Sequence, residues 1–194
     1  MLSGLLVDLV PYGDAFKAQD HTWRNGPGVF YWATGGQWFV TRAGIERMHA
    51  DQREEREGGS LRVGFGVQTK DGTPIGLFGI NHLDTHSRLA MLTALIGDPA
   101  YWGGGYGTDA LLLLVDYAFD WLDVRKVWLM TMSLNDRVMR QMEKTGFTLE
   151  ARMREAAWAN GAWCDTLAYG MFREDWPGRE ALIQRIGLRA RKDA

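Results

Sequence analysis

The stretch Ile96-Gly97-Asp98-Pro99-Ala100-Tyr101-Trp102-Gly103-Gly104-Gly105-Tyr106-Gly107-Thr108 decides the fold, because it places four glycines within five residues between an expected strand and an expected helix. Successive glycines let backbone N–H groups turn toward one point, since no Cβ blocks the turn or the approach of a ligand. The first turn of the following helix adds N–H groups without helical partners and a partial positive charge. The stretch therefore predicts a pyrophosphate cradle that needs no lysine.

Two other phosphate-binding motifs fit this stretch less well. Residues 105–110 have the form G-x-G-x-x-A of a dinucleotide-binding turn, but that motif requires an acidic residue about 20 positions later. Lys126 lies near that distance instead. A P-loop would require Gly-Lys-Ser/Thr, which the stretch lacks. A nicotinamide-dependent oxidoreductase is therefore a weak hypothesis, and it ranks below the two functions described in the following paragraphs.

The expected elements around the glycine stretch alternate between strands and helices. Before it, we expect a strand over 3–10, short helices and loops over 12–38, a helix capped by Thr41 and stopped at Gly58, and strands over 61–69, 74–82 and 88–96. After it, we expect a helix over 108–122, a strand over 126–133, a helix from Asn135 to Gly146, a hairpin of 147–157 with 163–172, and a terminal helix after Trp176. The helix over 108–122 is nearly all apolar, and its polar residues predict one thin stripe facing solvent: Asp109, Asp116, Asp120 and Asp123. We find no linker or repeat and expect one α/β (α+β) domain over 1–194.

Three segments in this order resemble the GNAT superfamily of N-acetyltransferases, in its RimJ/RimL-like branch, over residues 61–176. Trp102-Gly103-Gly104-Gly105-Tyr106-Gly107 resembles the family loop Q/R-x-x-G-x-G/A, with Trp102 in place of Gln or Arg. The residues from Asn135 to Phe147 resemble N-x-x-S-x-x-x-x-E-K-x-G-F, with Val138 in place of Ser. The terminal G-x-W-x-D…Y pattern is matched by Gly161, Trp163, Asp165 and Tyr169.

The resemblance implies a central mixed, mostly antiparallel sheet flanked by helices, with a V-shaped cofactor cleft between two parallel strands. It implies acetyl-CoA as co-substrate and no metal. Leu95 and Ile96 would pair with the pantetheine arm, and Asn135 and Arg140 would flank the cofactor. The pyrophosphate would be held by Trp102, Gly103, Gly104, Gly105, Tyr106, Gly107 and Thr108. From the residues alone, Asn135 is equally well a helix cap, and Arg140 with Lys144 equally well a surface row.

Catalytic residues cannot be carried over from the resemblance. Many relatives place a Glu in the strand before the loop, but residues 88–96 contain no acid. Ser or Tyr in the later helix is replaced by Val138 and Met142. His82 and Asp84 are weak candidates, because on a strand they would share one face with His86 and could relay a proton. The alternative, a polar hairpin end, is favoured over both the relay and a metal site.

The acceptor is expected to be a primary amine, such as a protein N-terminus, a polyamine or a small amine, which attacks directly in a ternary complex. The N-terminal segment either belongs to the core or forms the acceptor wall, through cation–π and carboxylate contacts. Its candidate residues are Trp23, Phe30, Tyr31, Trp32, Trp38, Asp14, Asp20 and His21. The second hypothesis is a non-catalytic acyl-CoA-binding module, which the missing Glu, Ser and Tyr suggest.

Composition excludes several other classes of protein. The 194 residues carry a net charge of −2, which gives no overall basic field for nucleic acid. Residues 126–154 nevertheless hold six Lys/Arg against three acids, a local patch that suits a polyanionic small ligand. The single Cys164 fits a reducing compartment, and we expect a cytoplasmic protein with no membrane partner. The sequence leaves a homodimer open.

Overall fold

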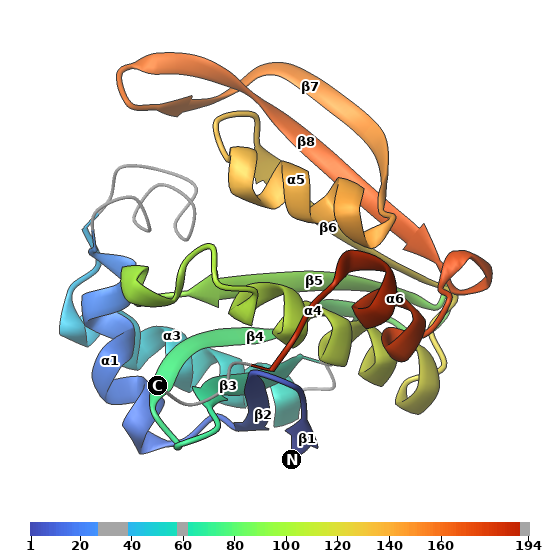
Figure 1. Ribbon diagram of the computed structural model, residues 1–194. Helices are drawn as coiled ribbons and strands as arrows, with labels where there is room; N and C mark the ends of the chain where they lie inside the picture. Colours follow the sequence, from blue (N-terminus) through green and yellow to red (C-terminus); the bar gives the residue numbers. More distant parts are fainter. Residues whose placement is uncertain (27–38, 58–61, 191–194) are drawn as a thin grey trace.

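A computed structural model describes residues 1–26, 39–57 and 62–190, and within them one eight-stranded sheet forms the frame (Figure 1). The strand order is β1-β2-β3-β4-β5-β6-β8-β7, and every neighbouring pair is antiparallel except β5 with β6. The strands are β1 (Leu2–Ser3), β2 (Val7–Pro11), β3 (Val63–Thr69), β4 (Pro74–Asp84), β5 (Leu89–Ile96), β6 (Lys126–Met132), β7 (Thr148–Ala159) and β8 (Ala162–Phe172). This is the mixed, mostly antiparallel sheet that the family resemblance implies.

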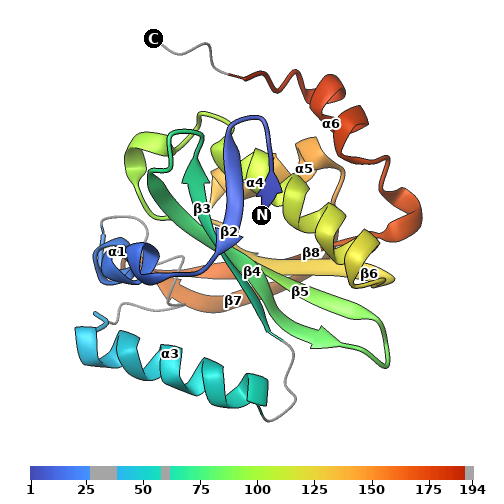
Figure 2. The same ribbon diagram turned by 90° about the horizontal axis from the view of Figure 1, so that it is seen from below.

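Helices cover both faces of the sheet. In the described residues they are α1 (Asp14–Arg24), α3 (Arg42–Glu57), α4 (Tyr106–Asp116), α5 (Asp136–Thr145) and α6 (Arg179–Ile186). Figure 2 shows α1 and α3 on the side of the sheet away from α4, α5 and α6. Phe16 of α1 packs against Gly66 of β3, where a Cβ would come within 2.4 Å of the ring. Glycine at this position lets α1 approach the strand closely.

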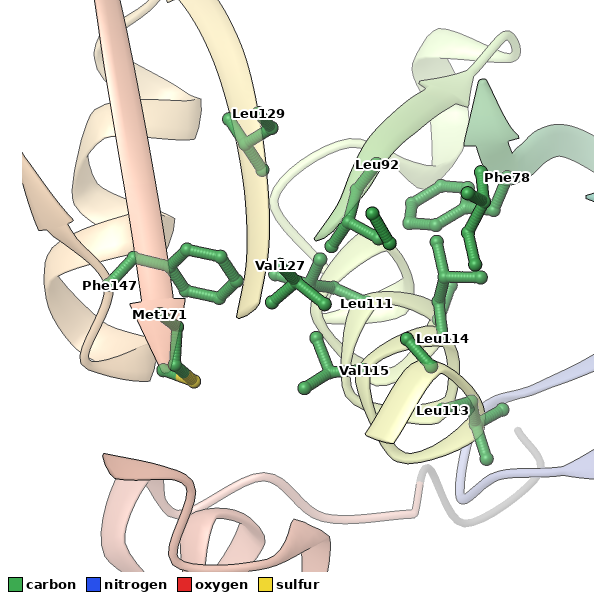
Figure 3. Close-up of a cluster of buried hydrophobic side chains, with 14 of the residues drawn as sticks. Phe78, Leu92, Leu111, Leu113, Leu114, Val115, Val127, Leu129, Phe147 and Met171 are labelled. Atoms are coloured by element: carbon green, nitrogen blue, oxygen red, sulfur yellow. The ribbon is translucent and has the colours of Figure 1, made fainter. Parts of the chain in front are cut away.

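The main core lies between α4 and the sheet. Every residue of α4 from Ala110 to Val115 is buried, as expected for a helix that is apolar on all sides. Figure 3 shows the side chains that fill this layer, which include Leu111, Leu114 and Val115 from α4 and Phe78, Leu92, Val127 and Leu129 from the strands. Burying side chains of this size contributes about 1.5–3 kcal/mol each, so the core fixes α4 and the glycine loop before it.

The predicted solvent stripe on α4 is wrong in its first half. Asp109 is completely buried, and its Oδ2 accepts hydrogen bonds from the backbone N–H of Leu6 (2.7 Å) and Val7 (3.1 Å). Asp116 accepts a bond of 2.8 Å from Trp176 Nε1. The stripe therefore faces the N-terminal hairpin and the C-terminal segment, and only Asp120 and Asp123 at its end are exposed.

Most element boundaries agree with the sequence prediction, and the differences are local. The expected strand over 3–10 is split into β1 and β2 by a turn in which Gly4 N bonds to Val7 O (2.8 Å). The β4 strand runs two residues further than expected, past a bulge between Ile80 and His82. Tyr106 begins α4 two residues early, and a π-helical turn follows over Tyr117–Trp121.

The predicted caps and turns are present. Thr41 Oγ1 accepts a bond from Gly44 N (3.0 Å) at the start of α3. Asn135 Oδ1 caps α5 by accepting from Val138 N (3.3 Å), and Gly146 ends α5 at φ 88°. Asn160 and Gly161 both have positive φ, as a two-residue hairpin turn requires.

The two parallel strands open into a V. Their pairing is limited to Leu89 with Lys126, Ala90 with Val127 and Met91 with Trp128, after which β5 and β6 diverge. The later residues of β5 therefore lack a ladder partner on the β6 side and present backbone groups to the opening. The expected cleft between two parallel strands is confirmed.

Candidate functional site

A cleft of about 1060 Å³ lies at the open end of the V. One wall is formed by the end of β5, the glycine loop and the start of α4. A second wall is formed by α5. A third wall comes from the C-terminal segment. The lining residues are Phe78, Ala94, Leu95, Ile96, Trp102, Gly103, Gly104, Gly105, Gly107, Thr108, Asn135, Arg137, Val138, Arg140, Gln141, Glu143, Lys144, Ile186, Gly187, Leu188 and Arg189.

The glycine loop turns its backbone toward this cleft. Gly103 (φ 77°) and Gly105 (φ 90°) adopt the left-handed conformation, which costs a non-glycine residue about 1–2 kcal/mol. Gly105 is the N-cap of α4, and the first helical bond runs from Asp109 N to Gly105 O (2.9 Å). The N–H groups of Gly107 and Thr108 precede that bond and have no partner within the helix. The loop therefore offers donors and the positive end of a helix to an anion.

Trp102 connects the loop to both walls of the cleft. Its Nε1 donates a hydrogen bond of 2.8 Å to the carbonyl of Ile96, at the end of β5. The guanidinium of Arg137, from α5, lies over the indole ring at 3.9 Å from the centroid. Burial and the neighbouring Arg140 lower the pKa of Arg137, whose ordinary value is high enough that it remains charged.

The α5 wall is polar and positively charged. Gln141 Nε2 donates to Thr108 Oγ1 (3.3 Å), which joins α5 to the first turn of α4 across the floor of the cleft. Arg137, Arg140 and Lys144 all face the opening, and Arg189 adds a fourth cation from the C-terminal segment. Glu143 is the one carboxylate among these lining residues, so the cleft carries a net positive charge.

The structure brings ten of the eleven predicted cofactor-binding residues to the lining of this cleft: Leu95, Ile96, Trp102, Gly103, Gly104, Gly105, Gly107, Thr108, Asn135 and Arg140. Tyr106 is the exception, and its ring instead packs edge-on against Tyr101 at 5.0 Å. Sequence reasoning missed Arg137, which lies one turn before Arg140 on the same face of α5. It also missed residues 186–189, which carry no motif.

The weak catalytic candidates lie elsewhere. His82 pairs with Met91 across the β4–β5 hairpin, four residues and roughly 13 Å along β5 from Leu95. Asp84 accepts bonds from the backbone N–H of His86 (2.9 Å) and Ser87 (2.8 Å), and these bonds lower its pKa. Neither His82 nor Asp84 lines the cleft. The hairpin end is thus a polar turn that Asp84 holds closed.

Part of the expected acceptor wall belongs to the core. Asp20 is completely buried and pairs with Arg24 at 2.7 Å, so it is an internal anchor of α1. Trp23 is also buried and packs on Gly97, directly after β5. Asp14 is exposed and pairs with Lys17, and His21 lies half-buried on α1. Phe30, Tyr31, Trp32 and Trp38 lie outside the described residues.

The terminal hairpin motif has a structural role. Asp165 accepts a bond from the backbone N–H of Glu155 (2.8 Å) and pairs with Arg152, which fixes the bulge of β7. Cys164 is buried, and burial raises the pKa of its thiol, so it is a poor nucleophile. Tyr169 is buried in the main core beside Leu129.

Neither a membrane span nor a metal site is found in the part of the chain that the structure describes. No helix there is both long and apolar enough to cross a bilayer. No group of three or more His, Cys, Asp or Glu residues there could hold a metal ion.

Comparison with known proteins matches residues 8–148 to the family model described as Acetyltransferase (GNAT) domain. A Bacillus subtilis protein, YdaF, which carries the name of a ribosomal N-acetyltransferase, is 27% identical over 110 residues; these span 57% of this chain and 60% of YdaF. Spermidine N-acetyltransferase from Vibrio cholerae, solved with CoA and spermine, superposes with a TM-score of 0.77 at 18% identity and covers 87% of this chain and 96% of its own. Mycobacterium smegmatis RimJ, solved with CoA-disulfide, gives 0.78 at 21% identity, over 93% and 89%.

Proposed function

Because this chain belongs to the GNAT acetyltransferase family, we propose that it transfers an acetyl group from acetyl-CoA to a primary amine. The observation that carries the proposal is the cleft itself. A glycine-rich helix start and an α5 wall rich in cations face one another beside the point where β5 and β6 diverge.

The residues of the cleft fit acetyl-CoA as a substrate. The N–H groups of Gly107 and Thr108 would hold the pyrophosphate, and the cations of α5 would balance its charge. The unpaired edge of β5 near Leu95 would bind the amide groups of the pantetheine arm, as another strand would. Gly97 N bonds to Ile75 O, so the alternating backbone of β5 turns Leu95 toward β4 and Ala94 and Ile96 toward the opening. The carbonyl of Ile96 has one lone pair engaged by Trp102 and keeps a second for this pairing.

The reaction forms a C–N bond and breaks the thioester C–S bond, so the amine must lose a proton and the departing sulfur must gain one. No acidic residue lies in β5, and the polar hairpin end is remote from the cleft. We infer that the amine loses its proton to water, and that the protein contributes mainly by holding the two substrates together. Such positioning alone can supply about 7–11 kcal/mol of the barrier.

The acceptor would approach from the end of the cleft next to α1, where Trp23 packs against the residue that follows β5. Polyamines and protein N-termini are the two classes of amine suggested by the names of similar proteins, spermidine N-acetyltransferase and the ribosomal L7/L12 α-N-protein acetyltransferase RimL. Cytoplasmic location and homodimer assembly remain predictions. Light scattering after size-exclusion chromatography measures the assembly directly.

Acetyl-CoA turnover with a panel of amines tests the proposal, using spermidine, an N-terminal peptide and a small alkyl amine. Gly107→Val should abolish CoA binding measured by calorimetry, because the valine side chain would enter the cleft beside Ile96. A Cβ added at Gly107 would already lie 3.4 Å from Cγ1 of Ile96. Gly107 does not have positive φ, so its backbone tolerates valine.

Gly13→Val is the matched control, since Gly13 has extended backbone, an added Cβ there would meet no atom closer than 4.0 Å, and Gly13 does not line the cleft. Unchanged CoA affinity in Gly107→Val would contradict the phosphate cradle. Tight CoA binding by the wild type with no turnover of any amine would instead favour the non-catalytic acyl-CoA-binding module.

A further inference from the structure

The pairing of Trp102 with Arg137 joins the glycine loop to the α5 wall of the cleft. Trp102 occupies the loop position at which the resemblance calls for Gln or Arg, so the loop itself lacks a polar side chain there. The indole is fixed at its nitrogen by Ile96 O (2.8 Å), and its face receives the guanidinium of Arg137 (3.9 Å). A residue of α5 thereby places a cation beside the glycine loop.

Arg137 forms no ion pair within the part of the chain that the structure describes. The charged group that affects its pKa is Arg140, which has the same sign. Arg137 is also partly removed from water, and both conditions disfavour the charged form. A stacked indole offsets only part of this cost, about 0.5–2 kcal/mol for a cation–π contact. An anion in the cleft would supply the missing partner.

We propose that Arg137 is a phosphate-binding residue of the coenzyme site and that Trp102 is the positioning residue that holds it there. The inference rests on the proposed function, and it assigns a phosphate contact to a pair of residues from two elements, the glycine loop and α5. A guanidinium suits this task because its planar set of donors matches phosphate oxygens.

A second cation–π pair in the protein provides a matched control. Arg125 lies over Phe172 at 5.3 Å, is exposed, and does not line the cleft. Arg125→Gln removes the same charge from the same kind of contact. If CoA binding weakens merely because a stacked arginine is lost, through lower stability or lower net charge, both variants will therefore show the same weakening.

The experiment measures the dissociation constants of CoA and of pantetheine, which lacks phosphate, by calorimetry at low and moderate salt. Arg137→Gln should weaken CoA roughly 10- to 100-fold, as expected for loss of a charge-assisted hydrogen bond. It should leave pantetheine unchanged and flatten the salt dependence of CoA binding. Arg125→Gln should bind both ligands as the wild type does.

A double-mutant cycle tests the positioning role of Trp102. Trp102→Leu should weaken CoA less than Arg137→Gln, and the double variant should be little worse than Arg137→Gln alone, because the two residues act through one contact. Independent, additive losses would overturn the positioning role.

Two results would overturn the phosphate assignment: wild-type CoA affinity in Arg137→Gln, or equal losses for CoA and pantetheine. Thermal melting of each variant identifies losses due to unfolding, and Arg137→Lys, which keeps the charge, should then recover part of the CoA affinity. A wild-type protein that binds no CoA would refute the proposed function itself.

Discussion

Asp109 and Arg179 are 70 residues apart in sequence and form an ion pair of 3.1 Å in which the carboxylate is completely buried. The other carboxylate oxygen accepts the backbone N–H groups of Leu6 and Val7. One side chain at the start of α4 therefore binds the N-terminal hairpin and α6 together, directly beneath the glycine loop.

Asp109→Ala should destabilise the protein by about 3–5 kcal/mol, because it leaves the partly buried guanidinium of Arg179 and two buried backbone donors without their acceptor. Urea unfolding followed by tryptophan fluorescence measures the change. Asp14→Ala removes an equally charged side chain that is 96% exposed, and it should leave the midpoint nearly unchanged. Equal midpoints for the two variants would show that the buried pair contributes nothing.

Gly105→Ala should destabilise the protein for two separable reasons. The φ of 90° costs about 1–2 kcal/mol for any residue with a Cβ, and that Cβ would lie 2.7 Å from Leu188 Cδ1. Adding Leu188→Ala should remove the contact and leave the backbone strain. The double variant should therefore be more stable than the sum of the two single changes predicts, and strict additivity would argue against the contact.

Asp116→Asn should stabilise the protein at neutral pH. Burial raises the pKa of Asp116, and the hydrogen bond from Trp176 opposes this only in part. Because the pKa of Asp116 is raised in the folded state, its protonated form contributes its full stabilisation to the folded protein below the ordinary pKa of 3.8. This contribution to the free energy of unfolding is lost as the pH rises through the folded-state pKa.

Asparagine keeps the acceptor for Trp176 without the charge, so its advantage should be largest near pH 7 and shrink toward about pH 4. Free energies of unfolding of both proteins across this range provide the measurement. An advantage that grows as the pH falls would mean that the sign of the pKa shift is wrong.

His82→Ala combined with Asp84→Asn should leave turnover and its pH profile unchanged, because these residues lie away from the cleft and Asp84 is engaged in its turn. The rate should instead rise with pH around the pKa of the acceptor amine itself, because only the neutral amine attacks. Two amines whose pKa values differ by about two units should show profiles displaced by the same amount. A drop of about 10²-fold in the double variant would make this pair the general base.

Local signals in the sequence predicted the elements that position the site. Runs of apolar residues marked β5 and β6, and the side chain of Asn135 and the glycine at 146 marked the two ends of α5. The glycine loop was readable because only glycine tolerates its positive φ values. Each of these features depends on residues close together in the chain.

Features that depend on distant residues were not readable. The spacing of Asp109 placed it on a polar stripe, but the spacing cannot say whether that stripe faces water or the N–H groups of a segment 102 residues away. Asp20 similarly reads as an acceptor contact until Arg24 and its burial are seen. Arg137 could be distinguished from Arg140 only by the position of Trp102 in space.

The wall formed by residues 186–189 has a consequence for biosynthesis. A ribosome makes the chain from the N-terminus, so the whole sheet and the glycine loop emerge before Leu188 can cover Gly105. A ligand stabilises only the conformation that it binds. Binding of the coenzyme can therefore stabilise the complete cleft only after residues 186–189 have been made.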